Sequence, residues 1–126
     1  MVRSSRIWVA ILGLPLCAGV LLGAVPARAH AVVIQSTPAI NAAVAPGTVA
    51  VTLRFNSRID HRRSRLTLIP AGGAPHPLQE GPVTEPDVMT TEMTDLAAGE
   101  YRLRWQVLAV DGHITRGDIP FSVKAP

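Results

Sequence analysis

The segment Asp111-Gly112-His113 places a carboxylate two residues before an imidazole. On an extended chain, residues i and i+2 point to the same side, so these two groups would converge on one ligand. Gly112 leaves room for a bend between them. Asp-Gly is also a common hairpin turn. By itself, the segment therefore fits a turn that carries a surface histidine better than it fits a metal-binding pair.

His30 is the second candidate, because it follows the small-residue pattern Ala27-Arg28-Ala29. Cleavage after such a pattern would make His30 the new N-terminus. The α-amine of an N-terminal histidine has a pKa of about 7.7–8.0, so the amine and ring Nδ1 can together chelate one metal ion near neutral pH. Cu(II) prefers nitrogen-rich, tetragonal coordination. The alternative is a cleavage site that merely happens to precede a histidine.

The remaining histidines and methionines of residues 30–126 have weaker claims as ligands. His61 is flanked by two arginines, whose positive charge disfavours a metal ion, and we expect it in solvent. His76 lies in a proline-rich stretch and is expected in an exposed loop. Met89 and Met93 share one face of a strand-like segment, which favours core packing over metal binding.

Residues 1–29 are expected to be a cleaved secretory signal peptide. Two arginines at the start precede an uncharged, almost wholly apolar run at 7–25, and the cleavage pattern follows. The run is long enough for an uncleaved membrane anchor, although Pro15 and Pro26 argue against a permanent span. We therefore expect residues 30–126 to form the mature domain in the periplasm.

The net charge of +3 comes from this N-terminal segment. Three of the 12 Lys and Arg residues lie in 1–29, so the remaining nine balance the nine Asp and Glu residues. A mature chain without net charge has no electrostatic support for binding nucleic acid. The single cysteine, Cys17, also lies in 1–29, which excludes an internal disulfide and a cysteine-based zinc site from residues 30–126.

Alternating apolar and polar residues predict that the mature chain is all-β. The clearest candidate strands, followed by the shorter ones, are 49–55, 101–107, 119–123, 31–36, 65–69 and 88–93. About seven short strands separated by Gly and Pro turns are typical of a two-sheet β-sandwich. Leu96, Gly99 and Tyr101 resemble the tyrosine corner of Greek-key sandwiches, with an ordinary core aromatic as the alternative.

Four segments carry a resemblance to a known family, in order and at suitable spacing: HAVVIQSTPA at 30–39, VTLRF at 51–55, LAAGEYRLRW at 96–105, and VDGH at 110–113 with FSV at 121–123. Together they make residues 30–126 similar to the CopC family of periplasmic copper-binding proteins. The resemblance implies an immunoglobulin-like Greek-key β-sandwich. It also implies one Cu(II) ion per mature chain, bound by the amine and ring of His30, by Asp111 and by His113.

The same resemblance implies a function: a monomeric, non-enzymatic copper carrier or buffer in copper homeostasis and resistance. Its expected partner, besides the copper ion, is a CopD-like transporter of the inner membrane. The ligand set requires that the start of the first strand and the loop after strand 101–107 lie at the same end of the sandwich.

This sequence departs from the family pattern in two places. Some members carry an acidic residue just after the VTLRF strand, where Asn56-Ser57 stand here. Some members have a methionine-rich loop, whose soft thioethers suit Cu(I), but the corresponding residues 69–80 contain no methionine. The sequence therefore gives no support for a Cu(I) site.

Two alternative functions stay open at this stage. One is a metal-free immunoglobulin-like interaction module. The other is a copper oxidase of the kind that attacks polysaccharides through an N-terminal histidine brace. Such sites leave a position open for oxygen, which Asp111 would occupy here. Residues 30–126 also have only Trp105 and Tyr101 to offer as an aromatic platform for sugars.

Overall fold

The computed structural model describes Gly23 and residues 30–126, so the predicted signal peptide lies outside the described residues apart from Gly23. The described part is all-β, as predicted. Its strands are β1 (Val33–Thr37), β2 (Ala42–Val44), β3 (Gly47–Phe55), β4 (Ile59–Pro70), β5 (His76–Leu78), β6 (Val88–Leu96), β7 (Gly99–Ala109) and β8 (Ile114–Val123). The described residues form no helix long and apolar enough to cross a membrane.

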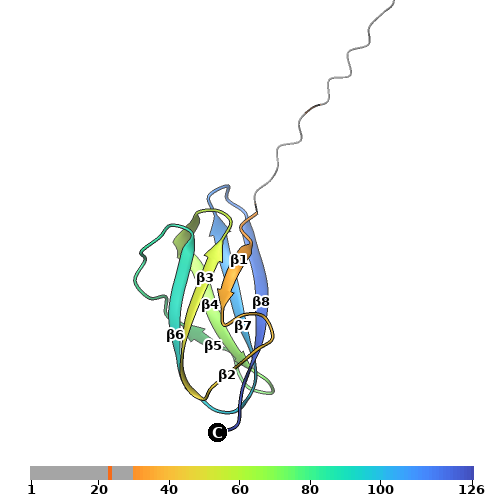
Figure 1. The fold of residues 1–126 in the computed structure, drawn as a ribbon. Helices are drawn as coiled ribbons and strands as arrows, with labels where there is room; N and C mark the ends of the chain where they lie inside the picture. Colours follow the sequence, from red (N-terminus) through yellow and green to blue (C-terminus); the bar gives the residue numbers. More distant parts are fainter. Residues whose placement is uncertain (1–22, 24–29) are drawn as a thin grey trace, which may run out of the picture.

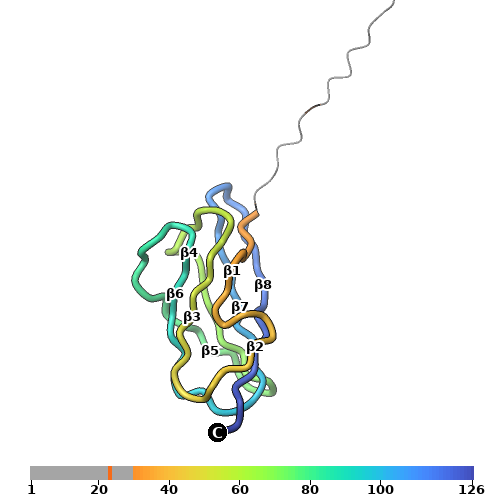
Figure 2. Tube along the Cα trace, viewed as in Figure 1, coloured from red at the N-terminus to blue at the C-terminus, as the bar shows by residue number. Residues whose placement is uncertain are grey.

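The strands form two sheets packed face to face (Figure 1). The smaller sheet has the order β1-β3-β6 and the larger has the order β2-β8-β7-β4-β5. All neighbours are antiparallel except β2 and β8, which are parallel. The chain crosses between sheets after β1, β2, β3, β5 and β6, as the tube in Figure 2 lets the reader follow. The predicted immunoglobulin-like sandwich is confirmed.

Inward-facing side chains of the two sheets build one core between them. Trp105 of the larger sheet contacts Phe55 of the smaller sheet edge to face, with 5.4 Å between ring centroids. Gly117, opposite Trp105 in the register, lies directly against the indole, and a Cβ there would come within 2.5 Å of it. Met89 and Met93 are 0% and 1% exposed, so the prediction that they pack in the core is confirmed.

The strand boundaries differ most from those predicted in β2, β4, β5 and β8, of which β8 begins at Ile114 rather than at residue 119. The three-residue strands β2 and β5 were not predicted, because so few residues show no alternation. Strand β4 begins at Ile59 rather than at residue 65, since an irregularity between Asp60 and Arg65 breaks its period-two pattern. His76 consequently lies in β5, paired with Leu68, rather than in a loop, although it is exposed as expected.

The start of β7 forms a tyrosine corner. The Tyr101 hydroxyl donates a hydrogen bond to the Ala97 carbonyl at 2.7 Å, and the ring stacks on Phe121 with centroids 5.5 Å apart. This pair closes the end of the sandwich where Gly99 lies opposite Val123. The turn that joins β7 to β8 lies at the other end.

Candidate metal centre

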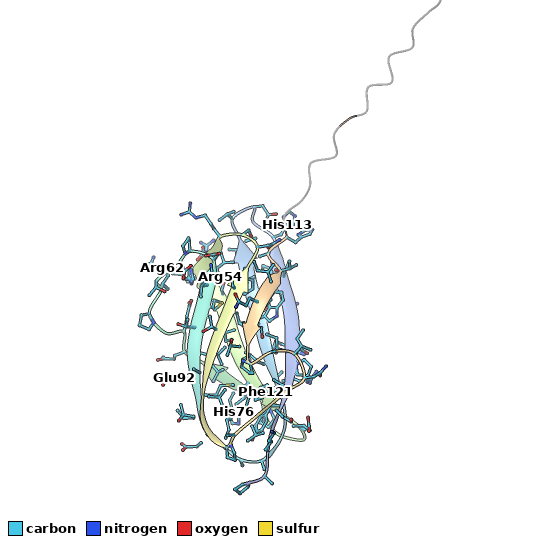
Figure 3. All side chains as sticks on the ribbon, viewed as in Figure 1. Arg54, Arg62, His76, Glu92, His113 and Phe121 are labelled. Carbon is cyan, nitrogen blue, oxygen red and sulfur yellow. The ribbon has the colours of Figure 1, made fainter. Side chains whose placement is uncertain are left out.

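The structure brings together the three side chains singled out in the sequence. His30, Asp111 and His113 each offer a ligand atom, and these atoms all lie within 4.8 Å of one another. The two imidazoles meet edge to face, with centroids 5.3 Å apart and planes at 89°. His113 lies at the end of the sandwich from which the chain enters β1 (Figure 3). The segment that begins at His30 and the β7–β8 turn therefore share one end.

The β7–β8 turn sets the positions of Asp111 and His113. Gly112 has a φ of 86°, a left-handed conformation that favours glycine, and its N–H donates to the Ala109 carbonyl at 2.9 Å. Asp111 and His113 are therefore not held together by an extended chain, and that part of the sequence argument is wrong. The turn itself holds them, so the hairpin and the paired side chains are compatible.

Hydrogen bonds within the turn orient the Asp111 carboxylate. The His113 backbone N–H donates to Oδ1 at 3.0 Å, and Oδ2 lies 3.2 Å from His113 Nδ1. The backbone hydrogen bond, together with the nearby His113 and His30 side chains, lowers the pKa of Asp111 below its ordinary value. The carboxylate is therefore ionised at neutral pH and ready to bind a cation.

The cluster is open to solvent. The Asp111 side chain is 34% exposed and the His113 side chain 47%. Two ligand atoms about 2 Å from one ion stand about 3–4 Å apart, so rotation of exposed side chains is enough to close the observed spacing. Two imidazoles and a carboxylate supply nitrogen and oxygen donors, which suit a divalent ion of intermediate hardness such as Cu(II).

The segment that carries His30 is fixed by two side chains that the sequence did not identify as important. The Thr115 hydroxyl donates to the Ala31 carbonyl at 2.6 Å, and Ala31 is fully buried. Asn56 accepts from the Val32 N–H through Oδ1 at 2.9 Å, and its own N–H donates to the Val32 carbonyl at 3.0 Å. Thr115 in β8 and Asn56 in the bend after β3 thus hold the two residues that follow His30.

Asn56 stands where some family members have an acidic residue, which was the only sequence signal that pointed to this position. Its amide makes the contact with Val32 without adding a negative charge. Thr115 gave no signal at all, because a threonine in an alternating strand is unremarkable until the strand's neighbours are known.

The other two histidines lie away from the cluster. The expectation that His61 is solvated is wrong, since its side chain is only 16% exposed and Nδ1 lies 2.5 Å from Glu80 Oε1. The segment between β5 and β6 covers it, a contact that neighbouring arginines in the sequence could not indicate. Among Gly23 and residues 30–126, only His30, Asp111 and His113 form a group of three that could hold a metal ion.

Comparison with known proteins shows the family of this chain. A family model described as the CopC domain matches residues 33–124. The chain belongs to the CopC family. It is 31% identical over 111 residues to copper resistance protein C of Xanthomonas campestris pv. juglandis, covering 82% of this chain and 87% of that protein. The family resemblance read from the sequence is therefore confirmed.

Solved structures of this family have the same fold. CopC from Methylosinus trichosporium OB3b aligns with a TM-score of 0.68 at 26% identity, over 76% of this chain and 95% of that one. PcoC from Escherichia coli, described as a methionine-rich copper resistance protein, aligns with a TM-score of 0.60 at 28% identity, over 76% and 100%. In contrast to PcoC's description, residues 30–126 of this chain have two methionines, both in the core.

Proposed function

We propose that this CopC-family protein is a periplasmic Cu(II) carrier or buffer that serves copper homeostasis and resistance. It binds one Cu(II) ion per mature chain through His30, Asp111 and His113. The observation that carries the proposal is the convergence of these three side chains within 4.8 Å, from segments at opposite ends of the described chain. Family membership supports copper as the ion.

The donor chemistry favours the oxidised ion. Imidazole nitrogen, amine nitrogen and carboxylate oxygen suit Cu(II), whereas Cu(I) prefers thiolates and thioethers. Residues 30–126 contain no cysteine, and Met89 and Met93 are enclosed by the core. The protein therefore holds copper in one oxidation state, as a carrier rather than a redox enzyme does.

Export completes the proposed site. Signal cleavage after Ala29 makes residues 30–126 the mature domain and frees the α-amine of His30, which then chelates the ion together with ring Nδ1. Thr115 and Asn56 support this arrangement, because they fix the two residues that follow His30. The mature protein acts as a monomer and exchanges copper with a CopD-like transporter of the inner membrane.

The proposal is tested by expressing the full chain with its signal and measuring the mass of the exported product. Cleavage after Ala29 is expected. Titration with Cu(II) should show one tight equivalent, with nitrogen hyperfine splitting in the electron paramagnetic resonance spectrum. His113→Ala should weaken binding sharply, and so should a glycine inserted before His30. His76→Ala, at an exposed histidine in β5, is the matched control and should bind like the parent.

Three results would contradict this function. Tight binding that survives both His113→Ala and the inserted glycine would remove the assigned ligands. Consumption of oxygen and reductant by the copper-loaded protein with a polysaccharide would favour the oxidase instead. An exported chain that binds no copper in any form would favour the metal-free interaction module.

A further inference from the structure

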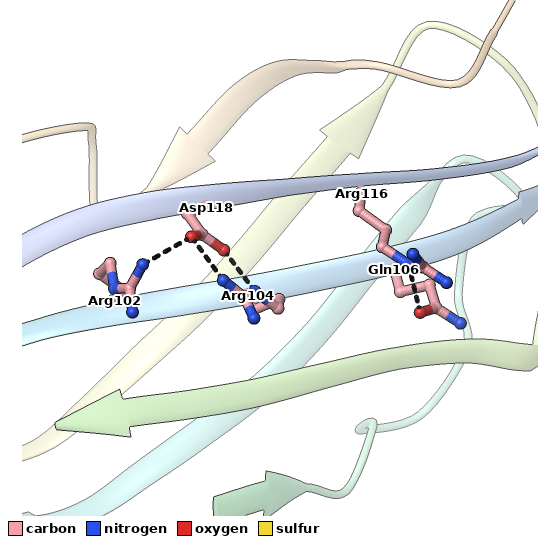
Figure 4. Close-up of polar contacts among 5 residues, drawn as sticks. All are labelled: Arg102, Arg104, Gln106, Arg116 and Asp118. Atoms are coloured by element: carbon pink, nitrogen blue, oxygen red, sulfur yellow. Dashed lines mark hydrogen bonds and ion pairs between the residues drawn. The ribbon is translucent and has the colours of Figure 1, made fainter. Parts of the chain in front are cut away.

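The outward side of the larger sheet carries a regular array of arginines. The register aligns three residues across β4, β7 and β8 in each row: Arg65, Gln106 and Arg116 in one, and Thr67, Arg104 and Asp118 in the next. Arg102 lies two residues before Arg104 on β7 and therefore points to the same side. We call the set Arg65, Arg102, Arg104, Arg116, Gln106 and Asp118 the arginine face, and Figure 4 shows all of these but Arg65.

The four arginines share this side of the sheet with three carboxylates. Asp118 lies among the arginines, whereas Glu100 lies two residues before Arg102 on β7 and Asp60 lies opposite Leu108 on β4. Asp118 accepts from Arg104 at 2.8 and 2.9 Å and from Arg102 at 3.1 Å. Arg116 donates to the side-chain oxygen of Gln106 at 2.7 Å. Within residues 30–126, neither Arg116 nor the exposed Arg65 forms an ion pair. These two guanidinium groups flank Gln106 and remain available to an anion.

Six of the nine acidic residues lie away from this side of the larger sheet. Glu85 and Asp87 pair with Arg54 of β3, in the smaller sheet, and Glu80 contacts His61. Glu92 is exposed on β6, also in the smaller sheet. Strands β4, β7 and β8 carry six arginines against three carboxylates, so the larger sheet has a net positive charge although the mature chain has none.

We propose that the arginine face is the docking surface for an acidic protein partner, which presents carboxylates to Arg65 and Arg116. Arginine recognises planar carboxylates with two parallel hydrogen bonds, and Asp118 between Arg102 and Arg104 already provides one example on this face. Gln106 holds Arg116 in a fixed direction, which favours defined carboxylates over the diffuse charge of a lipid surface.

The face is continuous with the end that carries the metal cluster. Ile114 lies two residues before Arg116 on β8, toward the end that carries the metal cluster, and is opposite Leu108 in the register. Ile114 is 57% exposed and Val110 is 71% exposed, and they border Asp111 and His113 in the sequence. A partner seated on the arginines would meet this apolar border and come next to the cluster. The proposed contacts are made by Arg65 and Arg116, which are not among the proposed metal ligands, so docking does not rest on copper binding.

The test compares two doubly substituted proteins, each prepared as the exported chain. Arg65→Glu with Arg116→Glu reverses the free cations of the face and leaves the Asp118 ion pairs intact. Arg58→Glu with Lys124→Glu makes the same change in total charge at exposed positions outside it. The probe is a fluorescein-labelled glutamate-rich peptide, followed by fluorescence anisotropy at low salt and at about 0.15 M salt, where the Debye length is about 8 Å.

The peptide should bind the parent and the control alike, and the face variant at least about tenfold more weakly, with an affinity that falls as salt rises. Copper stoichiometry should be the same in all three, which separates this proposal from the proposed function. Equal binding by both variants would overturn it. Binding to phosphatidylglycerol vesicles without binding to the peptide would replace the partner with a membrane. Self-association of the parent that the face variant loses would replace it with a second copy.

Discussion

At the scale of single residues, the candidate centre depends on side chains that do not themselves reach the ion. Thr115 and Asn56 hold the backbone of Ala31 and Val32, and these hydrogen bonds thereby restrict the position of the adjoining residue His30. A ligand on a fixed segment loses less conformational freedom when the ion binds, so these hydrogen bonds should contribute to affinity as well as to stability.

Replacing Thr115 by valine removes the hydroxyl that donates to the buried Ala31 carbonyl. We expect Cu(II) affinity to fall about fivefold, corresponding to the ~1 kcal/mol that such a hydrogen bond contributes. Competition titration against a chelator measures the affinity. Thr48→Val, at an exposed threonine near the start of β3, is the control and should not change it. Unchanged affinity together with lower stability would mean that the bond serves only the fold.

Replacing Asn56 by aspartate keeps an oxygen that can accept from the Val32 N–H and adds one negative charge beside the His30 segment. We expect tighter Cu(II) binding by about fivefold, because unit charges a few ångströms apart attract by ~1 kcal/mol even in water. The gain should shrink as salt is added. Asn56→Ser is the companion variant, and tighter binding there would show that charge is not the cause.

At the scale of elements, the β7–β8 hairpin combines three features along its length. Its turn carries Asp111 and His113, its outward side carries all of the arginine face except Arg65, and its far end carries the tyrosine corner. The hairpin is therefore the element that fixes the metal cluster relative to the proposed docking surface. The ion pairs of Asp118 join its two strands midway between these ends.

Asp118 should make the stability of the hairpin depend on pH. Hydrogen bonds and charge from Arg104, with a smaller contribution from Arg102, lower the pKa of Asp118 in the folded state. Its contribution is therefore full above the unfolded pKa of about 3.9 and is lost as pH falls through the lower folded value. Because the side chain is 27% exposed, we expect no more than about 1 kcal/mol.

Urea unfolding of the parent and of Asp118→Asn measures this contribution. The difference in unfolding free energy between them should be present at neutral pH and should shrink below about pH 4. Glu92→Gln, at an exposed carboxylate of β6, is the control and should show little difference at either pH. A difference that grows on acidification would contradict the assigned direction of the pKa shift.

At the scale of the whole molecule, the packing of the two sheets brings distant segments to one end. Thr115 and Ala31 are 84 positions apart in the sequence and are joined by a hydrogen bond. Trp105 and Phe55 connect the sheets at the core. Any change that separates the sheets should therefore weaken both the fold and the metal cluster.

Gly117→Ala tests that link between packing and site. The added Cβ would come within 2.5 Å of the Trp105 indole, which the core holds against Phe55. We expect a loss of about 1–3 kcal/mol in unfolding free energy, measured by urea with the fluorescence of Trp105 as the signal. Gly72→Ala, in an exposed turn with open space at the Cβ position, is the control, although its positive φ adds a smaller strain.

The sequence by itself determined the class of fold and the three candidate ligands. Period-two alternation follows from the geometry of a strand, and long strands such as β3 and β7 show it because one of their faces is buried. The Asp111-Gly112-His113 spacing and the pattern before His30 were readable because ligand types and cleavage patterns are local properties of the chain.

Only the tertiary structure decided how the remaining residues act. His61 is mostly buried and contacts Glu80. The side chains of Thr115 and Asn56 fix the His30 segment. Four arginines share one face of the larger sheet. Each of these facts depends on which strands are neighbours and in what register. Register arises from the packing of the two sheets against each other, which involves residues far apart in the chain, so no local pattern encodes it.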